Sequence, residues 1–170
     1  AGAGAVVLDA GTTVEALAEL LLSRDNHLAG GQEQLIITHA LHIAAKLSEA
    51  EGVGLELVGG RIRKLTSAAT GSRAVQHYDQ LRPDLAFVGC NGAHAQFGLS
   101  TPDPIEAVVK SAIVQAARRV VVLCDASKQD QETLTRFCSL EEIDTFITDR
   151  APVGDLAQAL EDADVEVVLA

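Results

Sequence analysis

The chain has 170 residues and carries 24 acidic against 13 basic side chains, a net charge of −11, with 48% apolar residues. This length and apolar content predict one folded domain over residues 1–170 and exclude a disordered or fibrous chain. Because affinity for phosphate backbones comes from clustered Lys and Arg, the acidic balance argues against a nucleic-acid surface on this chain.

The predicted elements alternate between short apolar runs rich in Val, Ile and Leu and longer segments of helical period, a pattern typical of β-α units in a parallel sheet. In chain order, the predicted strands lie at residues 5–8, 35–38, 55–58, 85–88, 120–124, 145–148 and 165–169. Helices are predicted at residues 14–22, 41–47, 68–81, 105–116 and 156–160. A small hairpin or flap is expected around residues 58–66 and 129–140. The sequence therefore predicts an α/β fold with three layers, in which helices cover both faces of a mostly parallel, Rossmann-like sheet.

The cysteines and the apolar runs indicate a cytoplasmic protein. Cys90, Cys124 and Cys138 show no Cys-x-x-Cys spacing, so neither a disulfide framework nor a zinc site is expected. The longest apolar run, residues 120–124, is far shorter than the ~20 residues needed to cross a bilayer, so no membrane contact is expected. Residues 1–5 lack an initiator Met and run directly into a strand, which we interpret as the start of a piece of a longer protein.

Glycine, threonine and aspartate follow several predicted strands. They occur at residues 9–13, 38–39, 59–61, 89–92 and 125–128. In an open parallel sheet, ligands bind beyond the carboxyl ends of the strands, so these segments are expected to converge on one rim. The sequence therefore predicts a ligand site there.

Gly11, Thr12 and Thr13 stand where the first predicted helix begins. Backbone N–H groups, two hydroxyls and the helix dipole would favour a bound anion at this position. An ordinary N-cap would use the same residue types. The other glycine-rich and polar loops on the rim favour the phosphate site, because a single cap does not require them.

Two lysines are the cations best placed to neutralise a bound phosphate. Lys110 lies about 140° around its helix from Ile105, off the predicted buried stripe, and an ordinary surface ion pair with Glu106 is the alternative. Lys128 follows a strand end and neighbours Asp125.

Two aspartates on the rim have two possible roles. Asp9 and Asp125 each follow a predicted strand directly. They could accept hydrogen bonds from ligand hydroxyls or tie down their own loops as Asx turns.

Several other patterns are discounted. His39 and His42 have no third ligand at a recognisable spacing, so no metal site is predicted. Cys90 is not predicted to be a nucleophile, because the sequence indicates no His or other base that would activate its thiol. The first strand–helix turn lacks both Gly-x-Gly-x-x-Gly and the Walker spacing, so neither a dinucleotide nor a nucleoside triphosphate is expected as a cofactor.

Short motifs follow one another along nearly the whole chain. They are residues 8–13, 37–40, 58–61, 71, 84–89, 98–99, 109–110, 123–128 and 143–149, and they include Gly11-Thr12-Thr13 and Asp125-Ala126-Ser127-Lys128. Together they resemble the C-terminal sensor domain of DeoR-family bacterial transcriptional repressors. The family more often has Thr-Asn-Ser where this chain has Thr38-His39-Ala40, so the imidazole would take the place of an amide at the ligand.

The resemblance implies a function in transcription control. Members of the family carry an N-terminal winged helix-turn-helix that binds operator DNA, followed by a domain that binds a phosphorylated sugar or related metabolite. That helix-turn-helix is not in these 170 residues, so operator DNA would be contacted only through it. The family also implies a homo-oligomer without catalytic activity.

The rival hypothesis is a sugar-phosphate isomerase, because the DeoR sensor domain shares its fold with ribose-5-phosphate isomerase and the CoA transferases. The isomerase's Asp-Gly-Ala-Asp-Glu motif is replaced here by Val88-Gly89-Cys90-Asn91-Gly92, and Lys110 stands where the isomerase carries its general-base Glu. A lysine with an ordinary pKa of ~10.4 is badly suited to move a proton between carbons. We therefore expect binding without catalysis.

The resemblance and the rim together give the expected site. Gly11, Thr12 and Thr13 would hold the phosphate, Lys110 and Lys128 would supply charge, and Asp9, Asp84, Asn91 and Asp125 would order loops or read hydroxyls. The complete expected set of effector-binding residues is Asp9, Gly11, Thr12, Thr13, Thr38, His39, Gly60, Asp84, Gly89, Asn91, Lys110, Asp125 and Lys128. No catalytic residue, metal or cofactor is expected.

Overall fold

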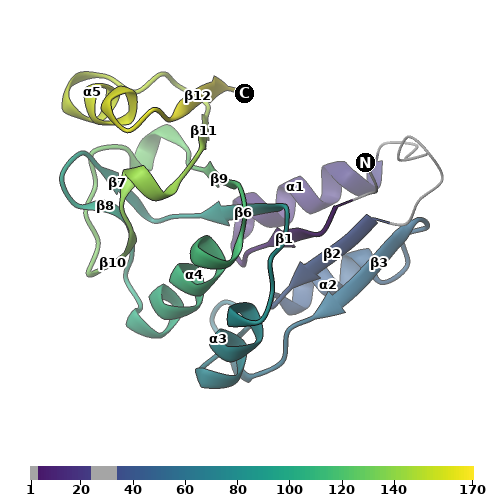
Figure 1. Ribbon diagram of the computed structural model, residues 1–170. Helices are drawn as coiled ribbons and strands as arrows, with labels where there is room; N and C mark the ends of the chain where they lie inside the picture. The colour runs from purple at the N-terminus through teal and green to yellow at the C-terminus, as the bar shows by residue number, and fades with distance from the viewer. Residues whose placement is uncertain (1–3, 24–33) are drawn as a thin grey trace.

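The computed structural model describes residues 4–23 and 34–170, and residues 1–3 of the N-terminal segment lie outside this range. Within the described residues, seven strands form a central parallel sheet (Figure 1). They are β1 (Val6–Leu8), β2 (Gln34–Thr38), β3 (Val53–Leu57), β6 (Leu85–Gly89), β9 (Val120–Leu123), β11 (Thr145–Thr148) and β12 (Glu166–Leu169). Their spatial order is β12-β11-β9-β6-β1-β2-β3. All predicted strands are confirmed to within two residues at each end.

Helices cover both faces of the sheet, because successive strand residues point to opposite sides. Val7 packs in one apolar cluster with residues of α3 (Ser72–Asp79) and α4 (Pro104–Ala116). Leu8 packs in another with residues of α1 (Thr12–Ser23) and α2 (Leu41–Leu47). The predicted three-layer, Rossmann-like α/β fold is therefore confirmed.

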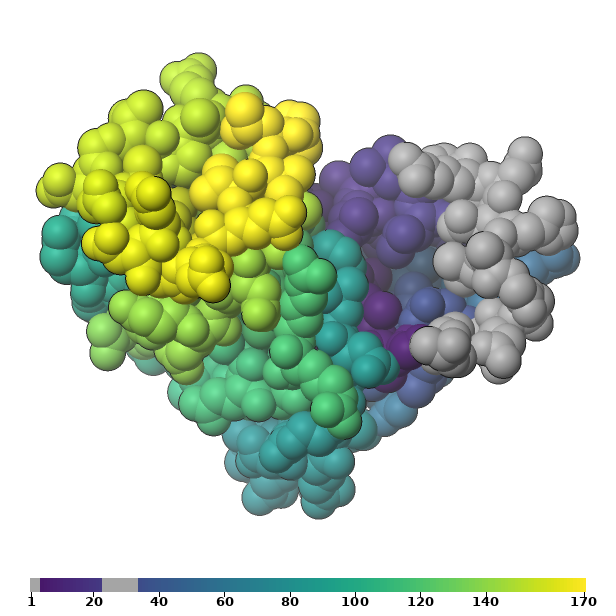
Figure 2. Space-filling model, turned by 45° about the horizontal axis from the view of Figure 1, so that its top comes forward, coloured from purple at the N-terminus to yellow at the C-terminus, as the bar shows by residue number. Residues whose placement is uncertain are grey.

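The C-terminal helix α5 (Gly154–Asp162) lies on the same face as α4. Its buried Leu156 and Leu160 share a cluster with Val122 of β9 and Phe146 of β11. In Figure 2, α5 and β12 (yellow) lie on one side of the visible face and α1 (purple) on the other, as the strand order requires.

Two smaller antiparallel sheets lie beside the central one. β4 (Arg61–Arg63) pairs with β5 (Ala68–Thr70) in the hairpin expected around residues 58–66, which extends to Thr70. The second sheet joins β7 (Gly92–His94), β8 (Gly98–Thr101) and β10 (Thr135–Cys138). Short 3₁₀ turns at Ala126–Lys128 and Leu140–Glu142 complete the elements.

The helix predicted over residues 68–81 is wrong at its start. Alanines favour helix locally, but Ala68 bridges to Ala40 and the Ala69 N–H donates to the His39 carbonyl oxygen at 2.8 Å. Gly71, at φ +90°, then turns the chain into α3. Long-range pairing overrides the local preference.

Helix α4 is fixed at its start by Asp103, whose Oδ1 accepts the Ile105 N–H at 2.8 Å, with Pro104 at the first helical position. This backbone hydrogen bond is the main reason why the pKa of Asp103 is lowered. The buried face of the helix includes Val109 and Lys110, whereas Ile105 is 57% exposed. The expected stripe is confirmed at Val109, Ala112 and Ala116 but wrong at Ile105, and so is the placement of Lys110 outside the core.

Candidate functional site

A cavity of about 290 Å³ opens at the carboxyl ends of β1 and β6. The chain runs outward from β1 through β2 to β3 and resumes at β6 on the other side of β1, so the strand order reverses between β1 and β6. Such a switch point is where open α/β sheets bind ligands. Most of the expected site residues line this cavity, namely Asp9, Gly11, Thr12, Thr13, His39, Gly89, Asn91, Lys110 and Lys128.

The start of α1 forms one wall of the cavity. Gly11 has φ +132° and open space where a Cβ would stand. The Glu15 N–H donates to the Gly11 carbonyl oxygen at 2.9 Å, so the preceding N–H groups of the first turn have no acceptor within the helix. Such N–H groups, together with the helix dipole, favour an anion.

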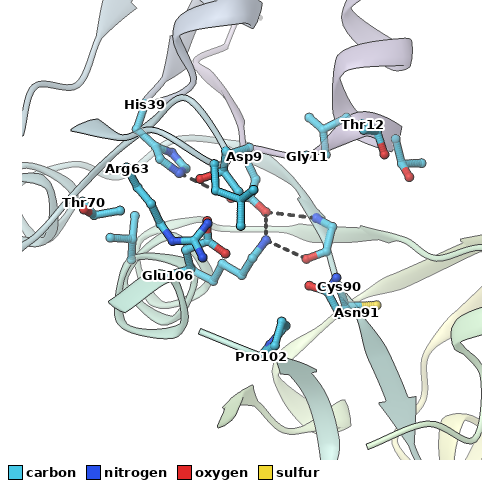
Figure 3. Close-up of a pocket in the computed structure, with 18 of the residues that line it drawn as sticks. Asp9, Gly11, Thr12, His39, Arg63, Thr70, Cys90, Asn91, Pro102 and Glu106 are labelled. Carbon is cyan, nitrogen blue, oxygen red and sulfur yellow. Dashed lines mark hydrogen bonds and ion pairs between the residues drawn. The ribbon is translucent and has the colours of Figure 1, made fainter. Parts of the chain in front are cut away.

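A buried ion pair forms the floor. Lys110 Nζ donates to Asp9 Oδ2 and, at 2.9 Å, to the carbonyl oxygen of Gly89, whose N–H donates to Asp9 Oδ2 at 3.1 Å (Figure 3). The side chains of Lys110 and Asp9 are 8% and 0% exposed. Lys110 Nζ also lies 5.5 Å from the centre of the Phe137 ring. The surface ion pair between Lys110 and Glu106 is therefore not the one formed, and Lys110 instead ties α4 to β1 and β6.

Lys128 and Asp125 lie at the end of β9. Lys128 lines the cavity and pairs with Asp125 at 2.9 Å. Hydrogen bonds from Ser127 and then from Lys128 lower the pKa of Asp125 to about 2. Asp125 does not itself line the cavity but caps its own turn, accepting the Ser127 N–H at 3.0 Å. The contacts of Asp125 therefore match the alternative in which it ties down its own loop as an Asx turn.

Three further expected residues do not line the cavity. Thr38 is buried and its hydroxyl donates to the Leu8 carbonyl oxygen at 2.7 Å. Gly60 packs so closely on the hairpin that a Cβ would lie 2.7 Å from the Thr70 carbonyl oxygen. Asp84 precedes β6 and accepts the Ala5 N–H at 3.0 Å, which places it at the amino edge of the sheet. The structure therefore does not bring these three residues together with the others at the cavity, and the contact of Asp84 with Ala5 matches the expected alternative that it orders a loop.

His39 forms part of the cavity wall through a polar network. Its Nδ1 lies 3.1 Å from the Tyr78 hydroxyl, and its Nε2 lies 3.7 Å from Asp9 Oδ1. Burial lowers the pKa of His39 to about 4, although Asp9 opposes this shift. The imidazole is therefore neutral near pH 7. Among residues 4–23 and 34–170, no group of three or more His, Cys, Asp or Glu side chains is placed to hold a metal ion.

The lowered pKa of His39 predicts that stability falls as the pH is lowered. The unfolded chain takes up a proton near pH 6.5, whereas folded His39 resists protonation down to about pH 4. Unfolding therefore binds a proton in this window, and about 3 kcal/mol of unfolding free energy is lost across it, at 1.36 kcal/mol per pH unit. We expect urea denaturation at pH 7, 6, 5 and 4.5 to show this slope.

A matched pair of variants isolates the contribution of His39. His39→Gln is expected to flatten the slope relative to the unmodified chain. His42→Gln, which changes an exposed histidine of α2, is expected to leave it intact. Equal slopes for all three proteins would contradict the assignment.

One whole wall of the cavity is formed by residues that the sequence did not indicate. Arg63, Thr66 and Thr70 come from the β4–β5 hairpin and Glu106 from α4. Arg63 bonds Asp103 at 2.6 Å and Glu106 at 3.4 Å, which ties the hairpin to α4. Figure 3 shows Arg63 and Thr70 across Asp9 from Gly11 and Thr12. The sequence indicated a hairpin, but nothing local to it shows which surface it covers.

The comparisons with known proteins cover almost the whole chain. Residues 2–150 match the family described as the DeoR C-terminal sensor domain. The HTH-type transcriptional regulator GlpR of Haloferax volcanii is 35% identical over 96% of this chain and 61% of its own length. The repressor GlcR of Bacillus subtilis is 30% identical over 96% of this chain and 60% of its own length. The glycerol-3-phosphate regulon repressor of Escherichia coli K12 is 28% identical, with 95% and 62% covered.

The chain thus spans 60–62% of the length of these three relatives. Within residues 4–23 and 34–170, no helix is long and apolar enough to cross a membrane. The family match extends through the cavity, from the start of α1 to the turn that carries Lys128. The chain belongs to the DeoR C-terminal sensor domain family.

Proposed function

We propose that residues 1–170 form an effector-sensing module of a transcriptional repressor, which binds a phosphorylated sugar or polyol in the cavity between β1 and β6. The observation that carries this proposal is the meeting of the amino end of α1 with Lys128 in one cavity. The N–H groups of Gly11, Thr12 and Thr13 and the ammonium group would hold the phosphate. His39, Asp9 and Asn91 supply polar groups for the rest of the ligand.

Control of transcription would act through a helix-turn-helix outside these residues. The Haloferax relative is named an HTH-type regulator and the other two are named repressors, which supports this role. The name of the Escherichia relative, which refers to glycerol 3-phosphate, supports a phosphorylated polyol as the effector class. The effector would change operator binding only through different affinities for two states of the repressor.

A panel of sugar and polyol phosphates tests the proposal. At about 100 times its Kd, a ligand adds about 2.7 kcal/mol to the free energy of unfolding. For a domain of this size that corresponds to a rise in Tm of about 5–11 °C. We expect such a rise for at least one phosphorylated compound and none for the same compound without its phosphate. A flat response across a broad panel would count against the sensor function.

A sugar-phosphate isomerase is the alternative function, because two carboxylates, Asp9 and Glu106, line the cavity. Asp9 is paired with Lys110 and Glu106 with Arg63. This pairing does not favour either carboxylate as a general base. We expect no turnover of ribose 5-phosphate above a blank. Measurable isomerisation would favour the enzyme.

A further inference from the structure

Two buried oxygen atoms in the cavity lack hydrogen-bond partners. Among the side chains that the structure describes, the buried oxygens without a partner are Asp9 Oδ1, Thr66 Oγ1, Thr101 Oγ1 and Thr133 Oγ1. Asp9 and Thr66 line the same cavity, whereas Thr101 and Thr133 do not. Because a buried polar group without a partner is costly, two such atoms around one cavity point to a ligand that completes both.

The backbone holds Thr66 in place over the cavity. It lies in the turn between β4 and β5, where the Ser67 carbonyl oxygen accepts the Leu41 N–H at 2.8 Å. On the other side, Arg63 bonds Asp103 at 2.6 Å. The hairpin is thus anchored to α2 and α4, and the Thr66 hydroxyl keeps its position at the cavity wall.

Thr66 belongs to the β4–β5 hairpin, a different wall of the cavity from the start of α1, where the phosphate is proposed to bind. Gly11 and Thr12 stand on one side of Asp9, and Arg63 and Thr70 of the hairpin stand on the other (Figure 3). A ligand whose phosphate rests on α1 therefore extends past Asp9 towards the hairpin. Along this path it meets the Asp9 Oδ1 carboxylate oxygen, which only accepts hydrogen bonds, and the Thr66 hydroxyl, which both donates and accepts them.

We propose that Thr66 determines ligand specificity, bonding a hydroxyl at the non-phosphorylated end of the ligand while Asp9 Oδ1 accepts a second hydroxyl. This inference rests on the proposed function and deepens it. The ligand class that fits is a polyhydroxylated phosphate monoester. Inorganic phosphate fills only the α1 end of the site and gains nothing from Thr66.

Calorimetric titration of the 170-residue chain tests the inference. The probes are inorganic phosphate, glycerol 3-phosphate, ribose 5-phosphate, glucose 6-phosphate and fructose 1-phosphate. We expect Thr66→Val and Thr66→Ala to weaken the tightest of the four esters by about 3–10-fold, as for one neutral hydrogen bond. The Kd of inorganic phosphate is expected to stay unchanged. Thr66→Ser, which keeps the hydroxyl, is expected to bind like the unmodified chain.

Thr133→Val is the matched control, because it removes another buried, unpartnered threonine hydroxyl outside the cavity. It is expected to leave every Kd unchanged. Ester binding that is unaffected by Thr66→Val and Thr66→Ala would overturn the inference and leave the proposed function standing. Equal weakening of phosphate and ester would also overturn it, since Thr66 would then act on the phosphate end or on the fold. If the unmodified chain binds none of the probes, the proposed function fails and the inference fails with it.

Discussion

Lys110→Met is expected to lower the free energy of unfolding by about 3–5 kcal/mol, the usual cost of removing one partner of a buried ion pair. The ammonium group of Lys110 neutralises Asp9, which is fully buried, and also donates to the Gly89 carbonyl oxygen. Methionine fills a similar volume but leaves both acceptors without this donor. At about 2–4 °C per kcal/mol, Tm should fall by about 6–20 °C.

Urea denaturation at pH 7 measures this effect. Lys46→Met is the control, because Lys46 pairs with Glu15 and Glu19 at the surface and such pairs contribute little. The double variant Asp9→Asn/Lys110→Met is expected to be more stable than Lys110→Met alone, since no unpaired charge remains. A change no larger than that of Lys46→Met would show that Asp9 does not depend on Lys110.

The same ion pair explains why the sequence predicted where the cavity lies but not which contacts form its floor. Asp9 and Gly89 each follow an apolar run that the sequence identifies as a strand, so the position of the sheet's rim was predictable. The position of Lys110 was not predictable, because the helical period indicates a buried face that includes Ile105, which is in fact exposed. A buried lysine needs a partner, and here the partner lies 101 residues away in sequence. Periodicity counts apolar residues and does not reveal such pairs.

Asp84 entered the expected site through the family resemblance and not through the rim of the sheet. It stands before β6 and therefore at the opposite edge, where it accepts the Ala5 N–H. Only residues that follow a parallel strand reach the ligand edge. The hairpin wall was beyond prediction for a different reason. Ala68 and Ala69 form a strand because β4 pairs with them on one side and the loop before α2 on the other.

Gly11→Val is expected to abolish the rise in Tm caused by a sugar phosphate. A Cβ at this position meets no protein atom within 4 Å, so the side chain would occupy the open space in front of α1, where the phosphate is proposed to bind. Its φ of +132° also strains any residue other than glycine. We therefore expect two separable effects, a lower Tm without ligand and no response to ligand.

Gly154→Val separates the two effects. Gly154 also has a positive φ, +60°, and open space beside it, but it lies at the start of α5 and does not line the cavity. This variant is expected to lose stability through backbone strain, by about 1–2 kcal/mol, and to keep the full response to ligand. For Gly11→Val, the measured quantity is the difference in Tm with and without ligand, so a lower starting Tm does not hide the result. A ligand response that survives in Gly11→Val would place the phosphate elsewhere in the cavity, away from the amino end of α1.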